Sequence, residues 1–291
     1  MSERYPIIAI TGSSGAGTTS VTRTFENIFR REGVKSVVIE GDSFHRYDRA
    51  EMKVKMAEAE RTGNMNFSHF GEENNLFGEL ENLFRSYAET GTGMHRHYLH
   101  STEEAAPFGQ EPGTFTQWEP LPADTDLLFY EGLHGGVVTD SVNVAQYPNL
   151  LIGVVPVINL EWIQKLWRDK KQRGYSTEAV TDTILRRMPD YVRYICPQFT
   201  LTDINFQRVP TVDTSNPFIA RTIPTPDESL VVIRFTNPRG IDFPYLLSMI
   251  HGSFMSRANS FVIPGSKQDL AMQVILTPII LQLLEKKRRA T

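Results

Sequence analysis

Apolar and polar positions along this 291-residue chain predict strands that alternate with helices. Continuous apolar runs are typical of buried strands, and they occur at residues 7–10, 37–39, 127–130 and 152–158, with strand-like runs at 204–212, 230–235 and 261–263. Helical spacing or charged character predicts helices at 18–33, 49–61, 76–90, 160–173, 177–188, 245–251 and 267–287. This alternation favours an α/β fold of three layers, with the site at the carboxyl ends of the strands.

The first predicted strand leads into a helix through a turn rich in glycine and serine. The turn fits the phosphate-binding spacing G-x-x-x-x-G-K-[ST], except that Thr18 replaces the lysine. Glycine backbone can wrap closely around a polyphosphate, and the next helix points its positive end at the same anion. Thr19 stands where a hydroxyl would contact Mg²⁺. The predicted nucleotide site comprises Gly12, Ser13, Ser14, Gly15, Ala16, Gly17, Thr18, Thr19 and Ser20. The alternative is a glycine-rich turn with no ligand.

Composition narrows the classes of function. The net charge is −4, so no overall basic field is available to hold nucleic acid. The single cysteine, Cys196, excludes an internal disulfide and a site built from several thiols, and it suits a reducing cytoplasm. The most apolar late stretch, residues 274–284, is too short to span a membrane. We therefore expect a soluble, cytoplasmic protein that binds neither nucleic acid nor membranes.

Acidic residues follow two of the predicted strands. Asp42 ends the second strand, where a carboxylate can accept the proton of a hydroxyl that attacks a terminal phosphate. A turn aspartate that caps the next helix is an equal alternative. Glu131 ends the third strand, where P-loop proteins commonly place an acid that helps to hold Mg²⁺. Its alternative is a strand-end carboxylate in solvent.

Basic side chains in the loops near Asp42 suit an anionic substrate, because arginine gives bidentate hydrogen bonds to phosphate. These residues are His45, Arg49, Arg96, His97 and His100. A transition-metal site at this cluster is disfavoured, since the usual carboxylates and thiols are absent from it. Residues 91–123 form a long irregular insertion with local hairpin patterns, which is typical of a binding loop.

The basic segment at 160–173 has two interpretations. Lys165, Asp169 and Arg173 recur four residues apart on one helical face, which fits an exposed ladder of ion pairs worth little. The same face fits a mobile lid over about residues 160–190 that closes on the phosphates and excludes water. In that interpretation Lys165 supplies the charge missing at Thr18, and Arg186 and Arg187 extend the clamp.

With these motifs the whole chain resembles the bacterial, NADH-regulated phosphoribulokinase family. The resemblance rests on the lysine-free loop at 12–19, E-G-D-S-F-H-R at 40–46, L-L-F-Y-E-G-L-H at 127–134, N-L-E-W-I-Q-K at 159–165 and V-D-T-S-N-P-F at 212–218. It implies a single domain over residues 1–291 with a nucleoside-monophosphate-kinase-like P-loop fold, a mixed sheet and helices on both faces. It also implies the Calvin-cycle reaction in which ATP phosphorylates the C1 hydroxyl of D-ribulose 5-phosphate.

The resemblance further implies residue roles. Asp42 matches the catalytic base, and Asp169 with Glu131 matches the carboxylates that serve Mg²⁺. The implied lid charges are Lys165, Arg168 and Arg173. The implied sugar-phosphate contacts are His45, Arg49 and His100. For Arg186 and Arg187 the implied role lies between a catalytic and a regulatory one. Arg31, Arg234 and Arg257 match arginines tied to NADH activation and AMP inhibition in a homo-octamer. The thiol switch of plant-type enzymes is not available, because no cysteine precedes Cys196.

Three rival functions use the same residues. A uridine-kinase-like enzyme would need a nucleoside pocket, whereas the His45, Arg49 and His100 set suits a phosphorylated acceptor. A P-loop switch that signals is disfavoured by the absence of a guanine-reading Asn-Lys-x-Asp motif. A non-catalytic AMP or NADH sensor is disfavoured by the intact Asp42 and Asp169.

Overall fold

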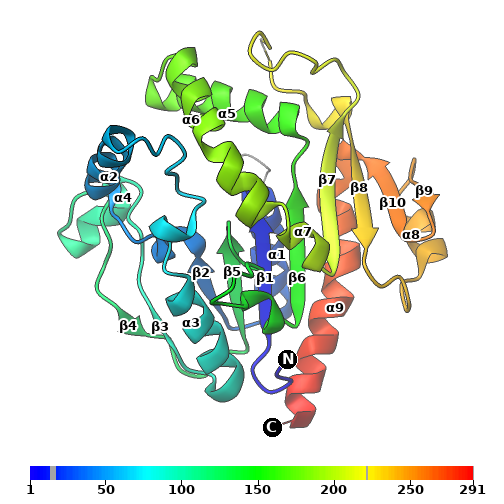
Figure 1. Ribbon diagram of the computed structural model, residues 1–291. Coiled ribbons are helices and arrows are strands. Elements are labelled where there is room, and N and C mark those ends of the chain that lie inside the picture. The colour runs from blue at the N-terminus through cyan, green and yellow to red at the C-terminus, as the bar shows by residue number, and fades with distance from the viewer. Residues whose placement is uncertain (14–17, 221, 291) are drawn as a thin grey trace.

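A mixed eight-stranded sheet runs through the computed structural model, which describes residues 1–13, 18–220 and 222–290 (Figure 1). The strand order is β2-β5-β1-β6-β7-β8-β10-β9. The five strands from β2 to β7 are parallel, and β8, β10 and β9 add an antiparallel edge. The strands are β1 (Ile7–Gly12), β2 (Ser36–Glu40), β5 (Leu127–Gly132), β6 (Leu150–Val155), β7 (Ile204–Pro210), β8 (Ser229–Phe235), β9 (Phe254–Arg257) and β10 (Ser260–Pro264).

Helices cover both faces of this sheet. Helices α1 (Thr18–Glu32) and α9 (Gln268–Ala290) pack on one face, and α3 (Phe77–Thr90) packs on the other. The central strand β1 is buried on both sides, with Ile8 and Ile10 in the first core and Ile7 and Ala9 in the second. This alternation follows from the two-residue period of a strand. The α/β fold with helices on both faces, predicted from the sequence, is confirmed.

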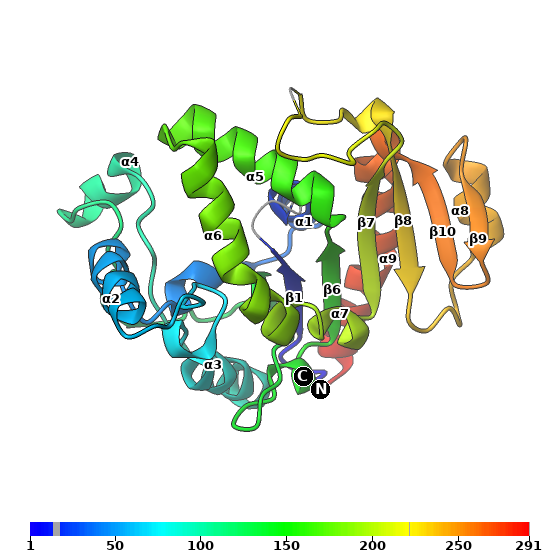
Figure 2. The same cartoon turned by 45° about the horizontal axis from the view of Figure 1, so that its top comes forward.

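A helical arm lies beyond the carboxyl ends of the parallel strands (Figure 2). It consists of α5 (Ile158–Arg173) and α6 (Thr177–Asp190), joined at Gly174, whose φ of +69° is in the left-handed region that favours glycine. Ser176 begins α6, because its hydroxyl accepts a hydrogen bond from the Ala179 amide. The α6 axis continues into a π-helical turn, η5 (Tyr191–Ile195), directly after Pro189.

Smaller elements surround the end of β2. They are η1 (Gly41–Phe44), α2 (Arg49–Arg61), α4 (Thr102–Ala105) and a separate hairpin of β3 (Met94–His95) with β4 (Glu119–Pro120). The insertion at 91–123 therefore does contain the local hairpin that its sequence predicts. The remaining α-helices among the described residues are α7 (Gln198–Leu201) and α8 (Phe243–Met249). None of the described helices is long and apolar enough to cross a membrane.

The structure corrects two predicted strand ends and adds a strand that was not predicted. The fourth strand ends at Val155 instead of residue 158, because Pro156 cannot donate to the ladder and Ile158 already begins α5. Strand β7 ends at Pro210 rather than at residue 212. Strand β9 was not predicted, since three of its four residues are exposed at the sheet edge and carry no clear alternation. Pro278 lies inside α9 without ending it.

Candidate active site

The carboxyl ends of β2, β5 and β1 bring the predicted acids beside the start of the phosphate loop. Glu40 of β2 pairs with Glu131 of β5, which in turn pairs with Ile10 of β1. Ser13 follows β1 directly and is fully buried. The predicted loop residues Ser14, Gly15, Ala16 and Gly17 lie outside the described residues, as do the side chains of Thr18, Thr19 and Ser20.

Two glycines set the spacing between η1, which carries Asp42, and β5, which carries Glu131. A Cβ at Gly41 would lie 2.8 Å from the Cα of Gly132, and a Cβ at Gly132 would lie 2.7 Å from the Cα of Gly41. Real Cβ atoms do not approach that closely, so any side chain at either position would push the two strand ends apart. The residue after Gly41 is Asp42, whose position therefore depends on this backbone contact.

Histidines flank the Asp42 carboxylate on both oxygens. His45 Nε2 lies 3.2 Å from Oδ1, and His100 Nε2 lies 3.8 Å from Oδ2. The other ring nitrogen of His45, Nδ1, is 2.9 Å from the Asn75 side-chain oxygen, which holds the ring in place. The Asp42 side chain keeps 43% of its surface exposed, so a substrate hydroxyl can reach it.

The histidines keep Asp42 ionised. Burial alone would raise the pKa of Asp42, but the hydrogen bond and charge of His45, aided by His100 and His69, lower it well below its usual range. Burial alone would lower the pKa of His45, whereas the hydrogen bond and charge of Asp42 raise it above the ordinary value. Asp42 and His45 therefore act as a coupled pair of opposite charge.

Two further groups at this site were missed from the sequence. The His69 ring lies 5.1 Å from the His45 ring, and burial, followed by the charges of His45 and Arg187, lowers the pKa of His69 to about 3. Glu40 Oε2 lies 3.8 Å from His100 Nε2, and burial raises the pKa of Glu40. No motif marked His69, because the stretch at 62–75 has no periodic pattern.

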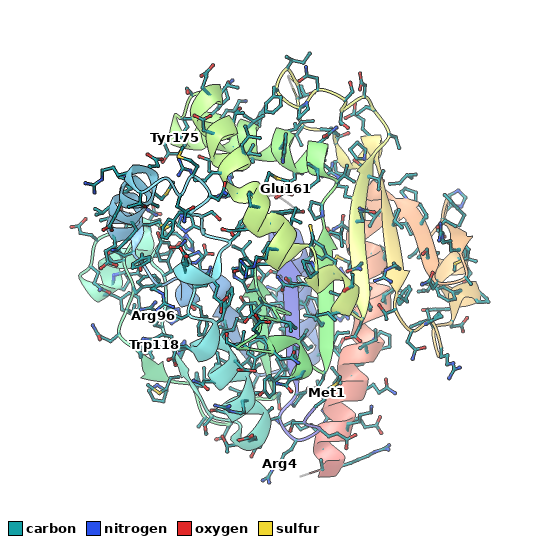
Figure 3. The ribbon with its side chains drawn as sticks, in the orientation of Figure 1. Met1, Arg4, Arg96, Trp118, Glu161 and Tyr175 are labelled. Atoms are coloured by element: carbon teal, nitrogen blue, oxygen red, sulfur yellow. The ribbon has the colours of Figure 1, made fainter. Side chains whose placement is uncertain are left out.

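Arg96 fixes the backbone of the turn that carries Asp42. Its guanidinium donates to the backbone oxygens of Ser43 at 2.8 Å and of His45 at 2.7 Å. It also stacks over the rings of Phe115 at 3.7 Å and Trp118 at 4.8 Å, and Figure 3 shows Arg96 beside Trp118. With its donors used in this way, Arg96 shapes the turn in this structure. Arg49, at the start of α2, is exposed and donates to the His100 carbonyl at 3.0 Å.

The Lys165–Asp169 pair is buried on the inner face of α5. Lys165 Nζ lies 2.6 Å from Asp169 Oδ2, and Arg168 Nε lies 3.1 Å from Asp169 Oδ1. The interpretation of these residues as an exposed ion-pair ladder is therefore wrong for Lys165 and Asp169. Burial, with the nearby charge of Arg187, lowers the pKa of Lys165 to about 8. The side chain of Arg173 lies outside the described residues.

Glu161 joins the arm to the start of the phosphate loop. The residue is buried, and the Ser13 hydroxyl donates to its Oε1. Its Oε2 is buried without a hydrogen-bond partner among the described residues, and burial raises the pKa of Glu161 to about 6. Figure 3 labels Glu161 in the first turn of α5. The motif N-L-E-W-I-Q-K contained this residue, but its spacing gave no sign of a contact with Ser13.

A small hollow between α5 and α6 collects cationic and apolar side chains beside Glu161. Its lining includes Lys165, Arg187, Trp162, Phe70 and Tyr191. The Arg187 guanidinium stacks over the Phe70 ring at 5.2 Å. Arg186 points elsewhere and pairs with Glu60 of α2, which ties the arm to that helix. The two adjacent arginines therefore have separate environments.

Within one chain the three arginines expected to bind effectors do not meet. Arg234 of β8 and Arg257 of β9 each pair with Ser260 of β10, so they share one row across the sheet. Arg31 of α1 instead donates to Gln273 and Thr277 of α9, at 3.2 Å and 2.9 Å. Because Ile233 and Phe235 of β8 face α9, Arg234 points away from that face.

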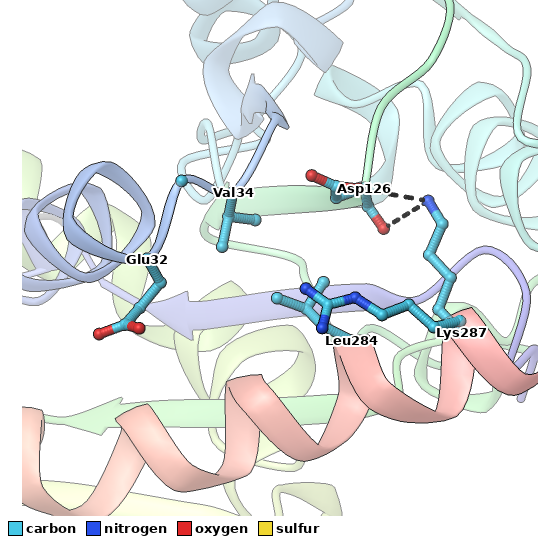
Figure 4. A pocket seen from close by; sticks show the side chains of 7 residues that line it. Glu32, Val34, Asp126, Leu284 and Lys287 are labelled. Carbon is cyan, nitrogen blue, oxygen red and sulfur yellow. Dashed lines mark hydrogen bonds and ion pairs between the residues drawn. The ribbon is translucent and has the colours of Figure 1, made fainter.

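A larger hollow of about 300 Å³ lies far from Asp42 (Figure 4). Its lining includes Glu32, Val34, Asp126, Leu284 and Lys287. Lys287 Nζ fills part of its wall by donating to the backbone oxygens of Thr125 at 2.6 Å and Asp126 at 2.9 Å. Because Asp126 precedes β5 and Glu32 ends α1, this hollow lies at the amino ends of the strands, away from the phosphate loop.

Comparison with known proteins agrees with this arrangement. A model of the phosphoribulokinase/uridine kinase family matches residues 7–215. The chromosomal phosphoribulokinase of Cupriavidus necator is 89% identical over 100% of this chain and 99% of its own, and the phosphoribulokinase of Nitrobacter vulgaris is 74% identical over 100% of both. A solved structure of phosphoribulokinase from Rhodobacter spheroides is 61% identical, covers 99% of this chain and all of its own, and superposes with a TM-score of 0.91. This chain therefore belongs to the phosphoribulokinase/uridine kinase family and is a kinase.

Proposed function

We propose that this chain transfers a phosphoryl group from ATP to the C1 hydroxyl of D-ribulose 5-phosphate, giving D-ribulose 1,5-bisphosphate and ADP in the Calvin cycle. The observation that carries the proposal is the partly exposed Asp42 carboxylate, held between His45 and His100 at the strand edge where the phosphate loop begins. Relatives named phosphoribulokinase that match over their whole length support the choice of substrate. We place the reaction in the cytoplasm and assign it to a single domain over residues 1–291.

Asp42 is the proposed general base. It accepts the proton of the C1 hydroxyl as that oxygen attacks the terminal phosphorus. The lowered pKa of Asp42 keeps the carboxylate ionised and able to accept a proton at neutral pH. His45 pairs with one carboxylate oxygen and His100 lies 3.8 Å from the other, and the exposed part of the carboxylate is available to the incoming hydroxyl.

The phosphate side of the site uses the loop and the helical arm. The proposed ATP ligands are Gly12, Ser13, Ser14, Gly15, Ala16, Gly17, Thr18, Thr19 and Ser20. The carboxylates of Asp169 and Glu131, with the Thr19 hydroxyl, are hard oxygen donors that fit Mg²⁺. When bound with ATP, Mg²⁺ supplies charge neutralisation at the β- and γ-phosphate oxygens.

Lys165 takes the place of the loop lysine that is missing at Thr18. In this structure its ammonium is paired with Asp169, so it must exchange that partner for a phosphate oxygen as the arm closes. Arg168, Arg173 and Arg187 add positive charge from the same arm, and Arg186 fixes the arm against α2 through Glu60. Closure would also exclude water from the transferring group.

The sugar-phosphate side uses exposed basic groups. Arg49 and His100 lie next to one another through the hydrogen bond from Arg49 to the His100 carbonyl, and both are accessible. With His45 they form the proposed contacts to the substrate's own 5-phosphate and hydroxyls. Arg96 acts indirectly, because it holds the backbone of the turn that carries Asp42 and His45.

Regulation by NADH as activator and AMP as inhibitor is part of the proposal, with Arg31, Arg234 and Arg257 as the phosphate-binding groups. Within a single chain Arg31 lies apart from Arg234 and Arg257. An effector site that uses all three would therefore have to form between subunits of a homo-oligomer, which we expect to be an octamer. The edge strand β9 and helix α8 supply a surface for assembly, with exposed apolar side chains at Tyr245, Leu247, Met249 and Phe254.

A panel of acceptors tests the proposed reaction. ADP release would be followed with MgATP and, in turn, ribulose 5-phosphate, ribulose, fructose 6-phosphate and uridine. We expect turnover with ribulose 5-phosphate and a loss of at least about tenfold in kcat/KM when its phosphate is absent, because the basic contacts then lose their partner. Turnover that prefers uridine would instead assign the chain to the uridine-kinase-like branch.

A further inference from the structure

The β3–β4 hairpin brings together two imidazoles and a carboxylate that the kinase reaction does not use. His95 of β3 lies directly across the hairpin from Glu119 of β4. His97 comes two residues after His95, just beyond the end of β3. His95 Nε2 lies 3.6 Å from Glu119 Oε1, and His97 Nε2 lies 3.7 Å from the same oxygen. The two rings lie 5.0 Å apart and nearly perpendicular. All three ligand atoms fall within 4.8 Å of one another.

These separations are too long for hydrogen bonds, so the three groups converge on a point without bonding to each other. In a tetrahedral zinc site with ligand bonds of about 2.0–2.1 Å, neighbouring ligand atoms lie roughly 3.3–3.4 Å apart. The two separations from the histidines to Glu119 exceed that by a few tenths of an ångström, and all three ligand atoms lie within 4.8 Å of one another. Small side-chain rotations of the histidines and Glu119 would therefore bring all three groups to a shared ion.

We propose that His95, His97 and Glu119 form a binding site for a divalent transition-metal ion of the zinc class, with one open position that water fills. Two imidazoles and one carboxylate match the donor preferences of Zn²⁺, Co²⁺ and Ni²⁺. Mg²⁺ prefers oxygen ligands, so the ion used with ATP does not compete well for this site. His97 and Glu119, 45% and 55% exposed, leave an entry path, while His95 is buried.

The site has the features of a pre-formed receptor. The His95 ring is buried, so packing within the hairpin fixes one ligand before an ion binds. The His97 backbone is fixed by Thr116: its amide donates to the Thr116 hydroxyl at 2.9 Å, and its carbonyl accepts from the Thr116 amide at 2.9 Å. Among the described residues, no other group of three His, Cys, Asp or Glu side chains meets the same distance test.

The ion would act on the active site through Arg96, which lies between the two histidines in sequence. While His95 and His97 converge on Glu119, Arg96 reaches the Ser43 and His45 carbonyls of the turn that carries Asp42. An ion bound to His95 and His97 would restrict the backbone of the segment that carries Arg96. We therefore expect the bound ion to stabilise the hairpin and, through Arg96, the Asp42 turn.

The test is metal binding by tag-free protein that has been stripped with a chelator and kept in excess Mg²⁺. Zn²⁺ is titrated against a chromophoric competitor, and Co²⁺ is titrated while its visible absorption is recorded. We expect one tight ion per chain and a Co²⁺ spectrum typical of a tetrahedral nitrogen and oxygen site. His97→Ala and Glu119→Gln alter exposed positions and should keep the fold, yet each should weaken Zn²⁺ binding by about tenfold or more.

Matched controls separate this site from the catalytic carboxylates. His100→Ala removes a histidine near Glu40 and Asp42, and His251→Ala removes an exposed histidine elsewhere, so both should bind Zn²⁺ as the wild type does. Zn²⁺ should also raise the Tm of the wild type and not that of His97→Ala. The proposal is overturned if wild type and His97→Ala bind Zn²⁺ equally, or if His100→Ala rather than His97→Ala abolishes binding.

Discussion

Lys165 and Asp169 form a buried ion pair on one face of α5, with Nζ 2.6 Å from Oδ2. The proposed function directs both side chains at MgATP, yet in this structure they pair with each other, and Asp169 also pairs with Arg168. Opening this pair without a new partner would leave the buried Lys165 ammonium uncompensated, whereas Asp169 keeps Arg168, so we expect the pair to separate only when ATP supplies that partner. We therefore expect the arm to take one state in the free enzyme and another in the nucleotide complex.

Lys165 predicts an alkaline limb in the pH profile of the free enzyme. Because burial and the charge of Arg187 lower the pKa of Lys165 to about 8, the ammonium loses its proton as the pH rises past that value. kcat/KM for ATP should therefore fall above about pH 8, whereas bound phosphates should move the limb in kcat to higher pH. Activity measured from neutral to alkaline pH checks both limbs.

Two variants assign that limb. Lys165→Arg keeps its charge at every accessible pH, so its kcat/KM should be lower than that of the wild type but free of the limb. Lys165→Met should slow turnover strongly with a smaller change in ATP affinity, because the charge acts mainly in the closed transition state. An alkaline limb that persists unchanged in Lys165→Arg would exclude Lys165 as its source.

Asp42→Asn tests the proposed base. The amide keeps the shape of the side chain but cannot accept the hydroxyl proton, so kcat should fall by about 10²–10⁴ while nucleotide affinity stays near that of the wild type. The pKa of His45 should fall too, because the Asp42 charge is what raises it. Steady-state kinetics and NMR titration of the His45 ring provide the two measurements. A variant with near-normal kcat would remove Asp42 from the chemistry.

Glu161 predicts a pH-dependent effect on stability. Burial raises the pKa of Glu161 from 4.5 to about 6, so the folded state holds its proton more tightly than the unfolded state. The contribution of Glu161 to the free energy of unfolding therefore falls by about 2 kcal/mol as the pH rises from about 4.5 to about 6. Glu161→Gln has no such loss, so its Tm relative to the wild type should rise between those pH values. A Tm difference between Glu161→Gln and the wild type that does not change with pH would contradict the raised pKa of Glu161.

Gly41→Ala tests the backbone contact that spaces Asp42 from Glu131. The new Cβ would lie 2.8 Å from the Gly132 Cα, so the strand ends must separate, at a cost of about 1–3 kcal/mol of stability. Activity should fall as well, because the Asp42 turn moves. Gly78→Ala is the matched control, since it adds a methyl in open space on α3 and should stabilise the helix slightly. Equal Tm values for Gly41→Ala and the wild type would disprove the contact.

Arg257→Ala tests the effector site of the proposed function. The variant should respond less to NADH while its basal activity and ribulose 5-phosphate affinity survive, because Arg257 lies on the edge strand β9 outside the catalytic site. Activity is measured against NADH concentration, with the assembly followed by light scattering. An unchanged NADH response in an intact oligomer would exclude Arg257 from that site, and lost basal activity would assign it to catalysis instead.

The sequence by itself determined the features that depend on neighbouring residues. The apolar run at 7–10, the glycine-rich turn and the helix after it define a strand, loop and helix because glycine, periodicity and strand length act locally. The placing of Asp42 and Glu131 at strand ends followed from the same local pattern, since each residue comes directly after or within a short apolar run. Parallel strands with their carboxyl ends at one edge then bring both acids to the site.

Only the tertiary structure decided which side chains are buried and which partners they meet. Spacing within α5 predicted that Lys165 and Asp169 share a face, but the packing of α5 on α6 and the strand ends made that face a buried one. Glu161 meets Ser13 across 148 residues of sequence, and His95 meets Glu119 across a hairpin whose register no local pattern specifies. Long-range contacts of this kind depend on the whole packed chain, and local periodicity carries no information about them.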